Sequence, residues 1–145
     1  MTDPQQGVIP HLVVDDAAAA LEFYETGLGA TETMRVPAED GKRIMHAEMN
    51  VNGAKVYLRD DFPEFCPVQQ GKRSSPHALE GTPVTLHLDV PDCDAAVERA
   101  ARAGAKIAMP PEDAFWGARY GLVIDPFGHS WSFAHPLPSS TSSKG

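Results

Sequence analysis

The sequence is poor in cysteine and in basic residues, and each shortage excludes a class of protein. Two cysteines, Cys66 and Cys93, occur among 145 residues. They form no close motif, which is typical of free thiols in a reducing compartment rather than of a disulfide framework. The 12 Lys and Arg residues are outnumbered by 20 Asp and Glu residues, so the formal net charge is −8. Because nucleic acids and anionic membranes bind basic patches, we expect neither as a partner.

Long hydrophobic runs are also missing. No apolar stretch approaches the roughly 20 residues that cross a bilayer. Residues 1–6 have neither the basic nor the apolar region of a signal peptide, and we therefore expect a cytoplasmic protein. With 42% hydrophobic residues, residues 1–145 are expected to form a single domain with a core of its own.

What the sequence does have is an internal repeat. The segment His11-Leu12-Val13-Val14-Asp15-Asp16 returns as His87-Leu88-Asp89-Val90-Pro91-Asp92, and the turn glycine Gly53 returns as Gly128 at nearly the same offset. A shared order of elements over half a chain indicates two copies of one supersecondary unit. Two such units related by a pseudo-twofold axis would enclose a cleft, where we expect the functional side chains.

Module one, residues 7–60, is predicted to be a strand, a helix and three further strands. Asp16 can cap the helix and Gly29 can end it, and Asn52-Gly53 favours a hairpin turn. The predicted strands are 8–14, 31–36, 44–51 and 54–59.

Module two, residues 82–135, is predicted to repeat this order. Its predicted strands are 83–90, 106–109, 117–124 and 130–133, with a helix between Asp92 and Gly104. The intervening residues 61–81, rich in Pro and Gly, are expected to be a connector, and 136–145 a disordered tail. The fold class is therefore α+β, with two βαβββ modules forming a cleft between curved mixed sheets.

Strand alternation divides the first strand of each module into two faces. Leu12 and Leu88 belong to the apolar face, which should pack against the helices. His11 and His87 belong to the opposite face and should point into the cleft. By the same alternation Glu48 lies on a polar face of the third strand.

These features resemble the vicinal oxygen chelate superfamily, which includes glyoxalase I, extradiol dioxygenases, fosfomycin-resistance enzymes and bleomycin-binding proteins. The motifs that carry the resemblance are Asp16…Phe23-Tyr24…Leu28-Gly29 after the first strand and Asp125-Pro126-x-Gly128 before the last. Further segments look like its PhnB-like branch: Val8-Ile9-Pro10, His46-Ala47-Glu48, Gly81-Thr82-Pro83-Val84 and Glu112-Asp113-x-Phe115-Trp116-Gly117-x-Arg119-Tyr120-Gly121. The resemblance spans residues 7–135 and implies a homodimer.

Enzymes of this superfamily hold a divalent metal ion by side chains from the first and last strands of each module. The resemblance places Ile9, Tyr57, Thr85 and Ser132 at these positions. Hard divalent cations prefer carboxylate or imidazole ligands. We therefore predict that the usual metal site is absent and that the protein needs no cofactor.

Two functions remain open, and no catalytic residue is assigned. The first is metal-independent binding of a small molecule in the cleft. Its candidate ligand-binding residues are His11, Glu48, His87, Trp116, Arg119 and Tyr120. The aromatic rings could stack on a planar ligand while Arg119 pairs with its carboxylate or phosphonate; alternatively, Arg119 could bridge to Glu112 or Asp113 within its own hairpin.

The second function is a metal-dependent lyase or dioxygenase. It would use a displaced site at His11, Glu48 and His87, a set of two histidines and one carboxylate that suits a divalent metal such as non-haem iron. The sequence leaves open whether the modules that enclose the site belong to one chain or to two.

Overall fold

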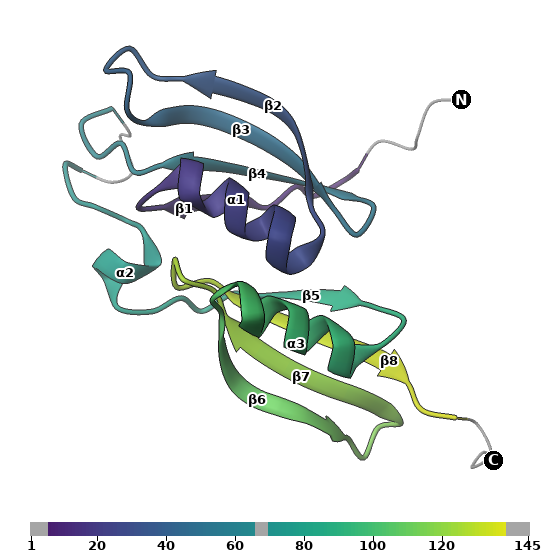
Figure 1. Ribbon diagram of the computed structural model, residues 1–145. Helices are drawn as coiled ribbons and strands as arrows, with labels where there is room; N and C mark the ends of the chain where they lie inside the picture. The colour runs from purple at the N-terminus through teal and green to yellow at the C-terminus, as the bar shows by residue number, and fades with distance from the viewer. Residues whose placement is uncertain (1–5, 66–69, 139–145) are drawn as a thin grey trace.

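The computed structural model describes residues 6–65 and 70–138 and confirms the α+β class. Module one contains β1 (His11–Val14), α1 (Ala17–Leu28), β2 (Thr31–Pro37), β3 (Ile44–Val51) and β4 (Ala54–Asp60). Module two contains β5 (Thr85–Asp89), α3 (Cys93–Ala103), β6 (Lys106–Asp113), β7 (Ala118–Ile124) and β8 (Ser130–Pro136). The short helix α2 (Pro76–Leu79) lies between them (Figure 1). No helix of the described ranges is long and apolar enough to span a membrane.

Each module folds into a four-stranded mixed sheet. The strand orders are β1-β4-β3-β2 and β5-β8-β7-β6, and in each sheet the first and last strands of the module pair in parallel. The other pairs are antiparallel. The two sheets therefore have the same topology, as the repeat predicts.

The helix caps form as the sequence predicts. The Asp16 side chain accepts a hydrogen bond from the backbone N–H of Ala19, and Asp92 does the same for Ala95 at the start of α3. Gly29 closes α1 with a φ of 72°, a left-handed conformation that glycine adopts without a steric penalty. Both helices therefore begin and end at homologous positions of the repeat.

Several boundaries differ from those predicted. β6 continues to Asp113 through two prolines, because a register shift between Met109 and Glu112 accommodates them. β8 extends to Pro136, which pairs with Ala118, so the last strand enters the stretch that was expected to be a disordered tail. The described part of the connector contains α2, which the sequence did not indicate. Cys66 and residues 139–145 lie outside the described residues.

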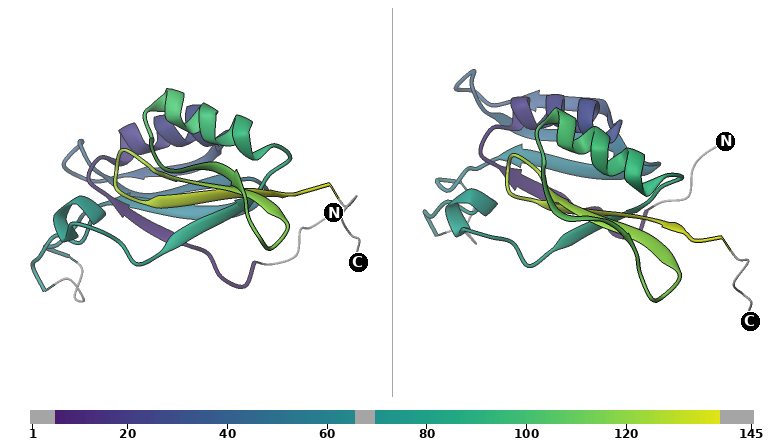
Figure 2. Two further views of the ribbon diagram at one scale, coloured as in Figure 1. Left: turned by 90° about the horizontal axis from the view of Figure 1, so that it is seen from below. Right: turned by 60° about the horizontal axis from the view of Figure 1, so that its bottom comes forward.

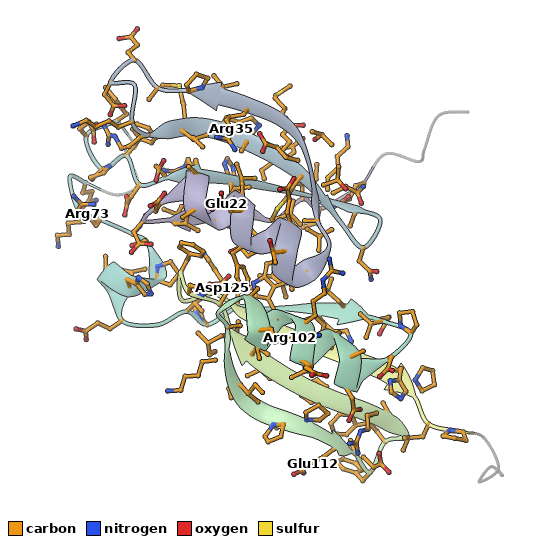
Figure 3. The ribbon with its side chains drawn as sticks, viewed as in Figure 1. Glu22, Arg35, Arg73, Arg102, Glu112 and Asp125 are labelled. Carbon is orange, nitrogen blue, oxygen red and sulfur yellow. The ribbon has the colours of Figure 1, made fainter. Side chains whose placement is uncertain are left out.

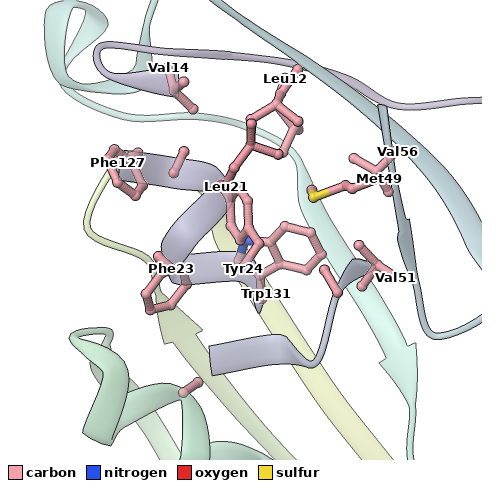
Figure 4. Packing of buried hydrophobic residues seen from close by; sticks show 14 of the residues in the cluster. Leu12, Val14, Leu21, Phe23, Tyr24, Met49, Val51, Val56, Phe127 and Trp131 are labelled. Atoms are coloured by element: carbon pink, nitrogen blue, oxygen red, sulfur yellow. The ribbon is translucent and has the colours of Figure 1, made fainter. Parts of the chain in front are cut away.

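The core lies between the sheets and the two helices. Helices α1 and α3 cover the same side of the molecule and pack against each other, while the sheets lie beneath them (Figures 1 and 2). Leu12 and Val14 of β1 face this core, as alternation predicts, and Tyr24 of α1 contacts Trp131 of β8 (Figure 4). The opposite face of each sheet has no helix over it.

One buried carboxylate joins the modules. Asp125, in the turn before β8, lies at the junction (Figure 3). Its Oδ2 accepts hydrogen bonds from the Tyr24 hydroxyl at 2.6 Å and from the Trp131 indole N–H at 2.9 Å. Burial, together with the nearby Asp125 charge, raises the pKa of Tyr24 well above its ordinary value, so the phenol stays protonated and donates. This bond fixes the first helix against the second sheet.

Candidate functional site

The helix-free face of module one carries a cluster of polar aromatic side chains. His11 on β1 and Glu48 on β3 are both register partners of Tyr57 on β4, so the three stand side by side. The Nε2 atom of His46 lies 2.9 Å from Oε2 of Glu48, and the ring centroids of His46 and Tyr57 are 4.9 Å apart. The His11 ring lies 5.7 Å from that of His46. We call His11, His46, Glu48 and Tyr57 the module-one cluster.

The protonation of His11 follows from its surroundings. Partial burial lowers the pKa of its imidazole below the ordinary value, and the neighbouring Arg59 and His46 lower it further. His11 is therefore neutral near pH 7. A neutral imidazole offers one N–H donor and one nitrogen acceptor, so His11 can either donate a hydrogen bond to a ligand or accept one from it.

The helix-free face of module two carries a second cluster at the corresponding place. His87 on β5 is the register partner of Ser132 on β8, and its Nδ1 lies 2.8 Å from the Ser132 hydroxyl. The His87 ring stacks on Tyr120 with centroids 6.2 Å apart, and Trp116 meets Tyr120 edge-on at 5.8 Å. We call His87, Ser132, Tyr120 and Trp116 the module-two cluster.

The two clusters match at two positions. Each contains the histidine of the first strand beside the hydroxyl-bearing residue of the last, His11 with Tyr57 and His87 with Ser132. The resemblance had placed Ile9 and Thr85 at the first-strand metal positions. The observed register pairs Thr85 with Ser130 instead, and Ile9 precedes β1. The histidines, rather than these residues, stand level with Tyr57 and Ser132.

The structure does not bring all predicted site residues together. A groove of about 480 Å³ does lie between the modules, and its lining includes His87 but neither His11 nor Glu48. Both histidines are exposed on their separate sheets. Within one chain the modules meet through their helices. Whether His11 and His87 share a pocket formed by two chains, the alternative that the sequence leaves open, stays a prediction.

Arg119 lies on a different face of the sheet from the one that the sequence analysis predicted. Its neighbours of the same alternation, Gly121 and Val123, face α3, and a Cβ added at Gly121 would come within 2.9 Å of Val97. Arg119 accordingly turns to the helix side of β7. There its Nε and Nη2 donate to Asp94 at 2.9 and 3.0 Å, and its Nη1 donates to Asp113 at 3.0 Å. The prediction that Arg119 lies in the cleft is wrong, and the alternative of a bridge to Asp113 is confirmed.

Two methionines were missed. Met34 on β2 is the register partner of Glu48, and Met109 on β6 is the register partner of Leu122, at the equivalent level of the other sheet. Their side chains are exposed beside the clusters. The signal that would have found them is cross-strand register, which the sequence alone does not supply.

The arrangement of His, Cys, Asp and Glu side chains bears on whether the chain can hold a metal ion. Among residues 6–65 and 70–138, no three or more His, Cys, Asp or Glu side chains are grouped so that they could hold one metal ion. The side chains level with the family positions, the Tyr57 phenol and the Ser132 hydroxyl, are poor ligands for a hard cation. The residues of one chain therefore do not fit the metal of the resembled enzymes; the absence of a metal from the assembled protein stays a prediction.

Comparison with known proteins decides the family. The model of the Glyoxalase/Bleomycin resistance protein/Dioxygenase superfamily matches residues 8–133. The chain belongs to this superfamily. This glyoxalase-superfamily protein is 52% identical over 128 residues to an uncharacterized protein of Mycobacterium tuberculosis, with 88% of this chain and 73% of the relative covered.

Two solved structures share the fold. TioX from Micromonospora sp. ML1 superposes with a TM-score of 0.70 at 28% identity, covering 92% of this chain and 100% of that one. A glyoxalase/bleomycin resistance protein/dioxygenase from Nocardioides superposes with a TM-score of 0.69 at 26% identity, covering 97% and 89%. Membership of the PhnB-like branch stays a prediction.

Proposed function

We propose that this superfamily member binds a small organic molecule on the helix-free faces of its sheets, and that a second copy of the chain completes the site. The observation that carries the proposal is the pair of matched clusters, each with a first-strand histidine beside a last-strand hydroxyl group. Helices α1 and α3 lie on one side of the sheets (Figure 2), and Leu12 and Val14, which alternate with His11, face the core on that side. We therefore assign the clusters to ligand binding rather than to the core.

The chemistry of the clusters supports a small-molecule ligand. Ligand sites in proteins are largely apolar and aromatic surfaces with a few convergent polar groups. The imidazoles, the Tyr57 and Tyr120 rings and the exposed Met34 and Met109 side chains supply such a surface. Arg119 is held on the other face by Asp94, so it does not contribute its charge to the module-two cluster.

The arrangement of the modules supports a homodimer. A twofold axis places the same surface of each copy against its partner, so the module-one face of one copy can oppose the module-two face of the other. Exposed apolar side chains border both faces, Met34 and Val36 on one and Met109 and Trp116 on the other. Exposed apolar patches of this kind mark interaction sites. Each dimer then contains two composite sites. We also propose a cytoplasmic location, which the low cysteine content of the sequence favours.

A complementation experiment tests the composite site. A thermal-shift screen of metabolites and antibiotics, bleomycin included, first supplies a probe. His11→Ala/His46→Ala damages one half of each site and His87→Ala/Tyr120→Ala the other half, so neither homodimer should bind the probe. Denaturing and refolding the two variants together should restore one site per mixed dimer. Binding by either homodimer alone, or a mixture that stays inactive although light scattering shows dimers, contradicts the proposal.

The metal-dependent alternative keeps one supporting observation. His11 and Glu48 flank Tyr57 on the same face, and a partner's module-two face would bring a second histidine toward them. Elemental analysis of protein purified without added metal, followed by titration with Fe²⁺, Mn²⁺, Ni²⁺ and Zn²⁺, tests it. Stoichiometric uptake that His11→Ala abolishes would favour the enzyme; we expect no such uptake.

A further inference from the structure

We infer that a groove at the outer end of module two binds an organic ammonium ion, a cation with apolar substituents. The groove encloses about 460 Å³ beside the β6–β7 hairpin, and its lining includes Met109, Glu112, Phe115, Trp116 and Tyr120. Glu112 marks its place at the far end of the molecule (Figure 3). The inference names the ligand class for the small-molecule binding proposed above, on which it rests.

Three aromatic rings form the walls of the groove. The Phe115 and Trp116 rings stand at 87° with centroids 5.1 Å apart, and the Trp116 and Tyr120 rings stand at 71° and 5.8 Å. Successive rings thus present surfaces in different directions, as the walls of a box do. The face of an aromatic ring is electrically negative and attracts alkylated ammonium groups. Phe115 is 97% exposed and Trp116 58%, so both rings are available to a ligand.

The charges around the groove favour a cation. Glu112 is the register partner of Tyr120, and its carboxylate makes no hydrogen bond or ion pair with any described residue. Asp113 shares its only guanidinium, that of Arg119, with Asp94. Among the residues that the structure describes, the Glu112, Asp113 and Asp94 carboxylates therefore have one ion-pair partner between them, Arg119. The excess of negative charge is the opposite of what the sequence suggested, which was that Arg119 would bind an anionic group of the ligand here.

Other classes of ligand would interact favourably with either the aromatic rings or the Glu112 carboxylate, but not with both. A neutral aromatic compound would contact the rings but leave the Glu112 carboxylate partly desolvated without a partner, which is unfavourable. An anion would meet that carboxylate directly. A bare metal ion gains little from apolar walls, and the described residues offer no cluster of ligands for it. An alkylated ammonium ion satisfies both the rings and the carboxylate.

The two tryptophans make a selective experiment possible. In a ¹H–¹⁵N spectrum of the full chain, the exposed Trp116 indole reports on the groove. The buried Trp131 indole, bonded to Asp125, serves as an internal reference. The probes are benzyltrimethylammonium, its uncharged carbon analogue neopentylbenzene, and benzenesulfonate. We expect the cation to shift the Trp116 signal with about tenfold higher affinity than the uncharged analogue, and the sulfonate to cause no shift.

Charge variants complete the test. Glu112→Gln should weaken binding of the cation severalfold and leave the uncharged analogue unaffected. Glu22→Gln, an exposed carboxylate on α1, is the matched control and should change neither. Equal affinity for cation and uncharged analogue overturns the ligand class while leaving small-molecule binding intact. An unshifted Trp116 signal overturns the groove itself, whereas failure of the complementation experiment overturns the composite site.

Discussion

At the scale of single residues, the side chains of the site divide according to strand alternation. His11 and His87 lie on the helix-free faces because Leu12 and Leu88, their neighbours in sequence, face the helices. Those placements could be predicted from the sequence. Arg119 could not be placed in the same way, because the sequence does not show which residues of β7 face the helix. That becomes clear only from the burial of Val123 and the close approach of Gly121 to α3.

Arg119 provides a direct check of this division. Since its guanidinium pairs with Asp94 and Asp113 on the helix side, Arg119→Ala should not lower the affinity for the screened probe. Tyr120→Ala, one position along the strand and on the other face, should weaken binding. Calorimetric titration of both variants measures the difference. A loss of affinity in Arg119→Ala equal to that in Tyr120→Ala would return Arg119 to the site.

The lowered pKa of His11 predicts a pH dependence of stability. At a pH between the folded and unfolded pKa values, the unfolded chain binds more protons than the folded one, so the free energy of unfolding rises with pH. This contribution is complete above the unfolded value of 6.5 and declines as the pH falls toward the folded value. Urea titrations from pH 5 to 8 should show the decline, and His11→Asn should reduce it. An NMR titration that finds the His11 pKa at or above 6.5 would contradict the view that His11 causes this pH dependence.

At the scale of secondary structure, capped helices and hairpins could be predicted and the lengths of edge strands could not. The Asp16 and Asp92 side chains cap backbone N–H groups three residues further on, and the Asn52-Gly53 turn joins strands that are consecutive in sequence. The length of β6 depends instead on whether a bulge can absorb Pro110 and Pro111 against β7. The helix α2 depends on an anchor distant in sequence, since Asp61 accepts hydrogen bonds from the backbone N–H groups of Ser74 and Ser75.

The turn beneath α2 should be intolerant of a side chain. Gly128 has a φ of +93°, and an added Cβ would lie 2.7 Å from the Pro76 Cβ. Gly53 has a similar φ of +89° with no atom within 4 Å, so it is the matched control. Gly53→Ala should cost about 1 kcal/mol from backbone strain alone. Gly128→Ala should cost at least about 1 kcal/mol more, because α2 must move. Equal losses in chemical denaturation would contradict the predicted contact.

At the scale of the whole molecule, the repeat predicts two alike sheets but not how they meet. The apolar helix surfaces and the polar sheet faces are both able to pair, and the sequence does not rank these alternatives. In the structure the helices pack together and a hydrogen bond to Asp125 joins the halves. The polar faces of the sheets are left uncovered by the helices, and it is there that we propose a ligand and a second copy bind.

The same junction predicts how the protein unfolds. Tyr24→Phe removes the donor to Asp125 and should lower the free energy of unfolding by about 2 kcal/mol, the range for hydrogen bonds to charged groups. Tyr120→Phe, whose hydroxyl bonds to no described residue, should change it by less than about 0.5 kcal/mol. In the wild type, Trp fluorescence and far-UV circular dichroism should report one shared transition. Two separate transitions would mean that the halves are not coupled.

The aspartate that both halves share also makes each half depend on the other. If the second half were expressed alone, its turn would hold a charged oxygen beside the Trp131 indole with the Tyr24 donor gone. The first half alone would expose a phenol that is now satisfied only from across the junction. Neither repeat therefore keeps a complete interior when it is separated from the other.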